Sequence, residues 1–135
     1  KLKKWKKICN GKKICIIATG NIIINAQEAI KKLNIQKIYP ALVSAYSIKP
    51  IDTSMMKKIL KIYKYIAVLE EHSAIGGLTS AISGFVLNFK NKNKFLTLTT
   101  GKNFVMKSGK QHEALKMLKL SPEDIKKKII NFLKK

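Results

Sequence analysis

The sequence contains no arginine, although 28 of its 135 residues are basic, so every basic side chain is a lysine. Only 7 residues are acidic, which gives a formal net charge of +21 at pH 7. Such an excess attracts phosphate groups, so nucleic acid and anionic membranes have to be considered as partners. Recognition of guanine and bidentate clamping of phosphate both favour arginine. We therefore expect salt-sensitive, non-specific adhesion to nucleic acid and no specific binding of it.

Cysteine and histidine are also scarce. Cys9 and Cys15 are too few and too close to hold a disulfide scaffold together, and His72 and His112 lie far apart, so no metal-ligand spacing is visible. No apolar run approaches the roughly 20 residues that span a bilayer, and the first residues lack the apolar core of a secretory signal. These absences predict a soluble protein of the reducing cytoplasm, without a metal site and without a membrane partner.

Short apolar runs alternate with helical patterns along the chain. A continuous apolar run suits a strand that is covered on both faces, and apolar residues at spacings of three and four indicate one face of a helix. Strands are expected at 14–19, 37–46, 66–69 and 95–98, and helices at 26–33, 53–63, 78–89 and from 121 onward. The alternation predicts an α/β fold, a three-layer α/β/α domain with a mostly parallel sheet.

The first thirteen residues are basic and carry Leu2, Trp5 and Ile8 at spacings of three. This pattern allows two interpretations, an amphipathic arm for a partner or a linker whose apolar residues rest on the domain. The linker is preferred because Asn10-Gly11 then makes a turn into the first strand. The division is thus a basic entry linker at 1–13 and one domain at 14–135.

Two helix starts carry local signals. Asp52 follows Pro50 and is expected as the N-cap of the helix at 53–63. Ser121 is expected as the N-cap of the last helix, with Pro122 at the first helical position and two acids facing the positive end of the helix dipole.

Three polar residues, Glu70, Glu71 and His72, follow the strand at 66–69. Open α/β sheets bind ligands at the carboxyl ends of their strands, so the two acids and the histidine are candidates for general acid/base chemistry. No motif places a nucleophile beside them. The preferred interpretation is that the acids accept hydrogen bonds from a helix start or contact another subunit, and no catalytic residue is assigned.

Gly76 and Gly77 precede the helix at 78–89. A phosphate cradle is one interpretation, because helix N-termini attract anions, but neither named glycine-rich fingerprint is present and two acids lie just upstream. A tight turn for close packing is the alternative. Lys49 fits either a buried ion pair or an exposed charge. The residues assigned to an interface or possible anion site are Lys49, Glu70, Glu71, His72, Gly76, Gly77 and Ser80.

Several segments, in order, resemble one family. Ile48-Lys-Pro-Ile-Asp52 and Val68-Leu-Glu-Glu-His-Ser-Ala-Ile-Gly-Gly-Leu-Thr-Ser-Ala81 are similar to the C-terminal domain of transketolases. The opening Gly11-Lys-Lys-Ile-Cys-Ile-Ile-Ala-Thr-Gly20, together with Gly101-Lys-Asn-Phe104, Ser108-Gly109 and Leu118-Lys-Leu-Ser-Pro-Glu-Asp-Ile125, extends the resemblance over about residues 10–134. Thr79 and Asn103 depart from the family, which often has Gly and Asp at these places.

The resemblance implies a part of a thiamine-diphosphate-dependent enzyme that moves two-carbon ketol units between sugar phosphates. In the family, thiamine diphosphate and Mg²⁺ lie between upstream pyrimidine- and diphosphate-binding domains, and the metal-binding Gly-Asp-Gly pattern of the cofactor domain is absent from this sequence. The implied role is packing on the middle domain and support of a homodimer, with no cofactor-binding residue in this chain. Deoxyxylulose-phosphate synthase, a pyruvate-dehydrogenase-type β subunit and a stand-alone anion-binding regulatory module stay open as alternatives.

Overall fold

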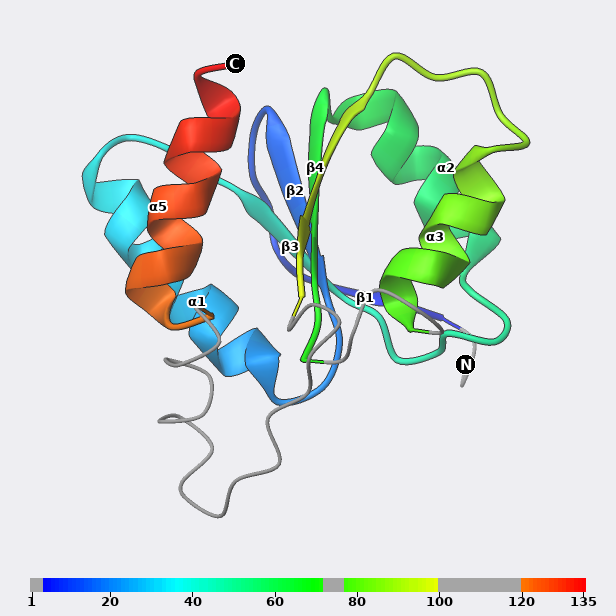
Figure 1. Ribbon diagram of the computed structural model, residues 1–135, viewed down its shortest axis with the longest axis horizontal. Helices are drawn as coiled ribbons and strands as arrows, with labels where there is room; N and C mark the ends of the chain where they lie inside the picture. The colour runs from blue at the N-terminus through cyan, green and yellow to red at the C-terminus, as the bar shows by residue number, and fades with distance from the viewer. Residues whose placement is uncertain (1–3, 72–76, 100–119) are drawn as a thin grey trace.

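A computed structural model describes residues 4–71, 77–99 and 120–135 (Figure 1). Its centre is a five-stranded sheet in the order β1 (Lys6–Cys9), β3 (Ala41–Ser44), β2 (Ile14–Ala18), β4 (Tyr65–Leu69) and β5 (Lys94–Leu98). The last four strands run parallel to one another, and β1 pairs with β3 in the antiparallel direction. The predicted three-layer α/β/α fold with a mostly parallel sheet is confirmed.

Helices cover both faces of the sheet. The helices α1 (Ile22–Ile35) and α5 (Pro122–Leu133) pack on one face, and α2 (Thr53–Ile62) and α3 (Leu78–Val86) pack on the other (Figure 1). Every residue of β2, β3 and β4 is buried, which explains why these strands are apolar throughout instead of alternating. Successive side chains point to opposite faces, so each central strand contributes to two separate cores.

Alternate residues of each central strand belong to different cores. Ile14 and Ile16 of β2 pack towards α1 and α5, whereas Cys15 and Ile17 pack towards α2 and α3. The α1–α5 layer is further tied by Asn25, whose Nδ2 donates to the Leu120 carbonyl at 3.0 Å. This two-sided burial fixes the strand register, because a shift of one residue would exchange the two cores.

The predicted helix caps at Asp52 and Ser121 are confirmed. The Asp52 carboxylate accepts a hydrogen bond from Met55 N–H at 3.0 Å. Ser121 and Asp124 form a reciprocal capping box, with Pro122 opening α5. Both signals lie within four consecutive residues, which is why they can be recognised in the sequence alone.

Strand β1 lies inside the segment that the sequence analysis assigned to an entry linker. Residues 6–9 pair with β3, and the side chains of Lys6, Lys7 and Ile8 are exposed, so β1 shows no apolar run. Its anchor is Trp5, whose indole N–H donates to the Ser47 carbonyl and whose backbone N–H donates to Asp52 at 2.8 Å. The sheet therefore begins before residue 14, because pairing with β3 and the burial of Trp5 hold this segment in place.

Candidate functional site

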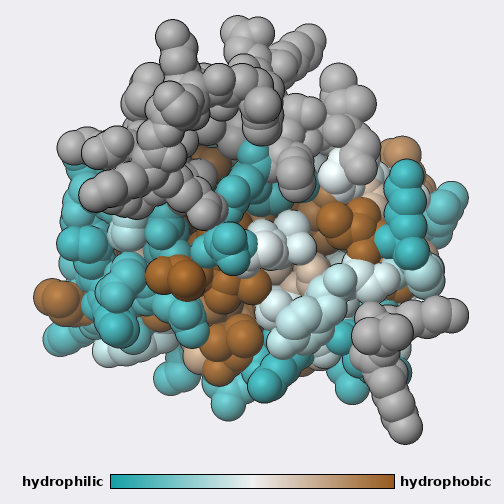
Figure 2. All heavy atoms as spheres, turned by 90° about the horizontal axis from the view of Figure 1, so that it is seen from below, coloured by the Kyte–Doolittle hydropathy of each residue, from teal (hydrophilic) through white to brown (hydrophobic). Residues whose placement is uncertain are grey.

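The carboxyl ends of the parallel strands meet at one end of the molecule. In the sheet register Ala18 is aligned with both Ser44 and Leu69, so β2, β3 and β4 end at the same level. Ligands of open α/β sheets bind outside this edge. Figure 2 looks onto this end and shows hydrophobic side chains exposed among hydrophilic ones. The residues that follow these strands are therefore the candidates for function.

Glu70, the first residue after β4, is completely buried. Its backbone N–H donates to the Leu98 carbonyl at 3.1 Å, which holds it against the end of β5. Its side chain accepts two hydrogen bonds from the start of α3, from Leu78 N–H at 2.8 Å and from Thr79 N–H at 2.7 Å. Both carboxylate oxygens are thus engaged with donors that a helix start leaves unpaired. Of the two roles weighed for these acids, the structure shows the helix cap for Glu70.

Gly77 allows this cap to form. A Cβ atom at position 77 would overlap the Oε1 atom of Glu70, so any larger residue would displace the carboxylate. The N–H groups at the start of α3 already face a negative charge, which suits the positive end of the helix dipole. A phosphate at this helix start would have to replace Glu70, so the geometry favours the internal cap over a phosphate cradle.

Glu71, the second residue after β4, contributes to a different group of residues from Glu70. With Thr19, Gly20, Asn21 and Ile48 it lines a hollow of about 150 Å³. Thr19 and Asn21 were not among the predicted site residues, although Thr19 directly follows β2 and its place at a strand end was a usable signal. Polar side chains that follow β2 and β4 therefore line one hollow, where a ligand or another protein could contact them.

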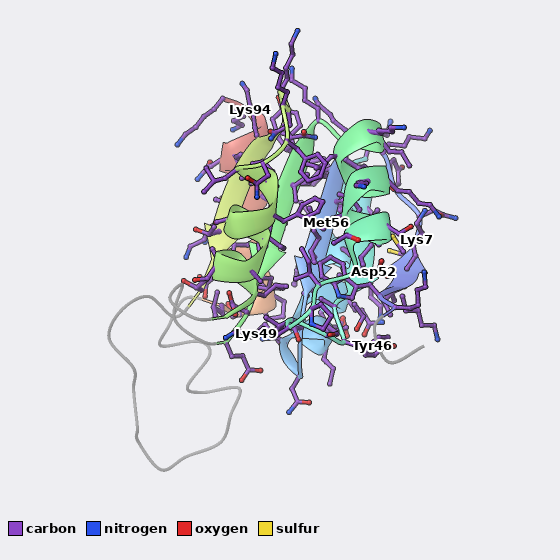
Figure 3. The ribbon with its side chains drawn as sticks, turned by 90° about the vertical axis from the view of Figure 1, so that its right-hand side faces the viewer. Lys7, Tyr46, Lys49, Asp52, Met56 and Lys94 are labelled. Atoms are coloured by element: carbon purple, nitrogen blue, oxygen red, sulfur yellow. The ribbon has the colours of Figure 1, made fainter. Side chains whose placement is uncertain are left out.

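The other predicted site residues are dispersed. Lys49 is exposed on the loop between β3 and α2, at the same end of the molecule as Tyr46 (Figure 3). Ser80 is exposed in the first turn of α3, directly after Thr79, whose N–H donates to Glu70. His72 and Gly76 lie outside the described residues, as does Asn103. Thr79, one of the departures from the family pattern, is buried in the first turn of α3.

In residues 4–71, 77–99 and 120–135, no three His, Cys, Asp or Glu side chains lie close enough together to bind a metal ion. Among the helices of the same ranges, none has the length and apolar character that crossing a membrane requires. Cys9 and Cys15 are both free thiols.

The comparisons with known proteins agree on one family. The family model described as transketolase, C-terminal domain, matches residues 3–125. A 1-deoxy-D-xylulose-5-phosphate synthase of Haemophilus influenzae (strain PittGG) is 33% identical over 132 residues, which are 98% of this chain and 20% of that protein. A putative transketolase C-terminal section of Methanocaldococcus jannaschii is 35% identical over 133 residues, 98% of this chain and 40% of that protein. The chain thus spans between a fifth and two-fifths of the length of these curated relatives.

Solved structures show the same architecture. A split-gene transketolase, described as an inactive beta4 tetramer, superposes with a TM-score of 0.83 at 25% identity, over 99% of this chain and 43% of that one. A transketolase variant from Pichia stipitis in complex with fructose 6-phosphate gives a TM-score of 0.67 at 21% identity, over 96% of this chain and 18% of that one. The second likeness shows the fold alone.

Proposed function

The chain belongs to the family of transketolase C-terminal domains, and from that premise we propose that it is the non-catalytic C-terminal domain or subunit of a thiamine-diphosphate-dependent enzyme. The complete enzyme would transfer two-carbon ketol units between sugar phosphates in the cytoplasm. One observation carries the non-catalytic role. The acid at the carboxyl edge, Glu70, is buried and accepts hydrogen bonds from the start of α3 at 2.8 and 2.7 Å, so its carboxylate is engaged in holding the fold.

Thiamine diphosphate and Mg²⁺ do not fit the residues described here. The diphosphate would need N–H donors or cations, yet the start of α3 already binds Glu70. Mg²⁺ prefers oxygen ligands such as carboxylates, and the described ranges hold no group of three His, Cys, Asp or Glu side chains that could bind a metal ion. In this proposal the cofactor lies in the upstream pyrimidine- and diphosphate-binding domains, as the resemblance implies, and this chain contributes packing.

The proposed contact surface is the carboxyl edge of the sheet. Tyr46 is 62% exposed beside the end of β3, and the exposed Lys49 follows it on the same loop (Figure 3). Tyrosine is enriched at protein interfaces, so the exposed ring of Tyr46 supports a contact at this edge. Glu71 and Ser80 belong to the same proposed surface, and His72, Gly76 and Gly77 join it on the sequence-based prediction.

Calorimetry on the 135-residue chain tests the assignment of the cofactor. Addition of thiamine diphosphate is expected to give no binding heat that depends on Mg²⁺, because the donors at the start of α3 are occupied and the described residues hold no cluster of metal ligands. Saturable micromolar binding by this chain alone that requires Mg²⁺ would overturn the proposal.

Assembly tests the contact surface. The chain is mixed with the protein that carries the upstream domains, encoded in the same or the neighbouring reading frame, and complex formation and ketol transfer are measured. Tyr46→Ser and Lys49→Glu are expected to weaken both. Ile62→Ser and Lys61→Glu are matched controls, because Ile62 is also 62% exposed and Lys61 is also exposed, but both lie at the far end of α2. Equal losses in the test and control variants would place the contact elsewhere.

A second reaction is supported by a specific observation, the 33% identity to a 1-deoxy-D-xylulose-5-phosphate synthase. The assembled enzyme distinguishes the two candidates. Formation of 1-deoxy-D-xylulose 5-phosphate would assign the chain to a synthase, whereas exchange of ketol units between two sugar phosphates would assign it to a transketolase.

A further inference from the structure

A second hollow lies at the opposite end of the molecule from the carboxyl edge, where the parallel strands begin. It has a volume of about 490 Å³, within the range of roughly 300–1,000 Å³ that small-molecule sites occupy. Its walls come from the turn before β2, the turn after α1 and the last turn of α5, which lie side by side in Figure 1. Nothing in the proposed packing role uses this cavity.

The walls of the cavity are largely apolar. They are formed by one tyrosine, which is 46% exposed, and four aliphatic side chains: Ile14, Ile38, Tyr39, Ile130 and Leu133. The surrounding backbone is held by hydrogen bonds, from Lys12 N–H to the Tyr39 carbonyl at 2.7 Å and from Tyr65 N–H to the Lys13 carbonyl at 3.1 Å. The cavity is therefore formed before any ligand arrives, and it can accept an apolar body.

Four lysines line the same cavity, Lys12, Lys13, Lys37 and Lys134, and none of the described residues that line it is acidic. Lys37 and Lys134 follow the ends of α1 and α5, so part of their role is to offset the negative ends of the helix dipoles. Lys12 and Lys13 precede a strand and have no such role. Cations from all three wall segments thus converge on one apolar hollow.

Two further lysines, Lys64 and Lys94, add positive charge at this end of the molecule. The ammonium groups of Lys13, Lys64 and Lys94 lie 5.7, 5.5 and 5.9 Å from the centre of the single Tyr65 ring. Figure 3 shows Lys94 at the opposite end of the molecule from Lys49. Like charges held around one ring repel each other, and a bound anion would relieve that repulsion.

Two of the lining lysines have backbone conformations that favour glycine. Lys13 has φ 73° and Lys37 has φ 63°. Lys37 follows the C-cap of α1, where its N–H donates to the Asn34 carbonyl and the N–H of Ile38 donates to the Leu33 carbonyl. This is the Schellman arrangement, in which glycine is the usual residue at the position of Lys37. Unfavourable backbone conformations cluster at binding sites, and both of these place a cation at one cavity.

From this combination we propose that the cavity binds a small amphiphilic anion, a molecule with an apolar body of several carbons and one phosphate or carboxylate group. The body lies on Ile38, Tyr39 and Leu133, and the anionic group is held by Lys13 and Lys37. A concave apolar hollow fits such a ligand better than it fits a nucleic-acid backbone, which needs an extended groove.

Calorimetry with monomeric octyl phosphate, at physiological salt, tests the site on the 135-residue chain. One saturable site is expected. Inorganic phosphate and octanol should each bind at least about tenfold more weakly, because each lacks one half of the ligand. Equal binding of inorganic phosphate, or binding only to anionic phospholipid vesicles and not to the soluble ligand, would overturn the proposal.

Variants locate the binding. Lys37→Gln is expected to weaken octyl phosphate about tenfold and Tyr39→Ser several-fold, whereas Lys90→Gln, an equal change of charge beyond α3 on the other face of the sheet, should leave the affinity unchanged. Lys37→Gly removes the backbone strain as well as the cation. It should raise the melting temperature and still weaken binding as much as Lys37→Gln. An unchanged affinity in Lys37→Gly, or an equal loss in Lys90→Gln, contradicts the site.

Discussion

The carboxylate of Glu70 occupies the space in which a side chain at Gly77 would begin. The two residues come from different elements, the end of β4 and the start of α3, and they are coupled because the helix start approaches the strand end this closely. Two hydrogen bonds, from Leu78 N–H and Thr79 N–H, depend on that approach. The glycine is therefore needed for the room that it leaves, and its effect on stability can be measured.

Gly77→Ala is expected to lower the free energy of unfolding by about 2 kcal/mol, because the Glu70 side chain has to move and its charge-assisted hydrogen bonds weaken. Urea unfolding followed by circular dichroism measures the change. Gly84→Ala is the matched control, since nothing lies within 4 Å of a Cβ atom at that position of α3. The control should gain about 0.5–1 kcal/mol, as alanine favours a helix over glycine. A gain in both variants would show that the Glu70 cap adjusts freely.

Glu70→Gln tests the charge of the cap with little change of shape. One carboxylate oxygen becomes an amide NH₂ that faces an N–H donor, so one buried hydrogen bond is lost, at a cost of about 1–3 kcal/mol. Glu28→Gln serves as the comparison, because Glu28 is an exposed residue of α1 that lies 3.6 Å from Lys31, and such surface pairs contribute about 0–1 kcal/mol. Equal effects in chemical denaturation would contradict the cap as a stabilising element.

Features with local signals could be predicted from the sequence. The buried strand β2 is a continuous apolar run, and the caps at Asp52 and Ser121 depend on residues within one helical turn of each other. Acids that accept hydrogen bonds from a helix start were one predicted role for Glu70 and Glu71, and the structure shows this role for Glu70; its complete burial was not predicted. Which of the two neighbouring acids points into the core depends on how side chains alternate at the end of β4. This could be seen only in the structure.

Features that join distant segments could not be predicted. Strand β1 has exposed lysines and finds its partner β3 more than thirty residues later, so its own sequence gives no strand pattern. The lysine-lined cavity is assembled from three segments between residues 12 and 134. In the sequence, Lys13 and Lys37 are two among 28 basic residues, and only their backbone conformations and shared cavity set them apart.

Asp52 makes stability depend on pH at the acid end. Burial raises the pKa of Asp52, but hydrogen bonds from the N–H groups of Met55 and Trp5, with the nearby charges of Lys4 and Lys58, outweigh burial and hold this pKa below its ordinary value. The ionised form is thus favoured in the folded chain. Its contribution is complete above the unfolded pKa of about 3.9 and is lost as the pH falls through the lower folded value.

The variant Asp52→Ser separates the cap from the charge, because serine also caps helices but does not ionise in this range. Unfolding by urea is measured from about pH 6 down to about pH 2. The wild-type chain should exceed the variant most at the upper end, and the difference should shrink as the pH falls. Glu123→Gln, at an exposed carboxylate paired with Lys126 at 2.7 Å, should change the profile less because solvent screens that pair. A constant difference between wild type and Asp52→Ser would show that the Asp52 charge has no part in stability.

The two thiols should differ in reactivity because the sheet buries them differently. Burial raises the pKa of the Cys15 thiol to about 12, against a smaller opposing effect of Lys7, and Cys15 is fully inaccessible in the core below α2. Burial also raises the pKa of Cys9, but Cys9 is only partly covered at the end of β1. Since the thiolate is the reactive form, a disulfide reagent at about pH 8 should modify Cys9 slowly in the native chain and leave Cys15 intact.

Both thiols should react at once in concentrated guanidinium chloride, and Cys9→Ser should abolish the native reaction while leaving one reactive thiol in the unfolded chain. Rapid native modification of Cys15 would mean that β2 is exposed to solvent far more often than its position at the centre of the sheet allows.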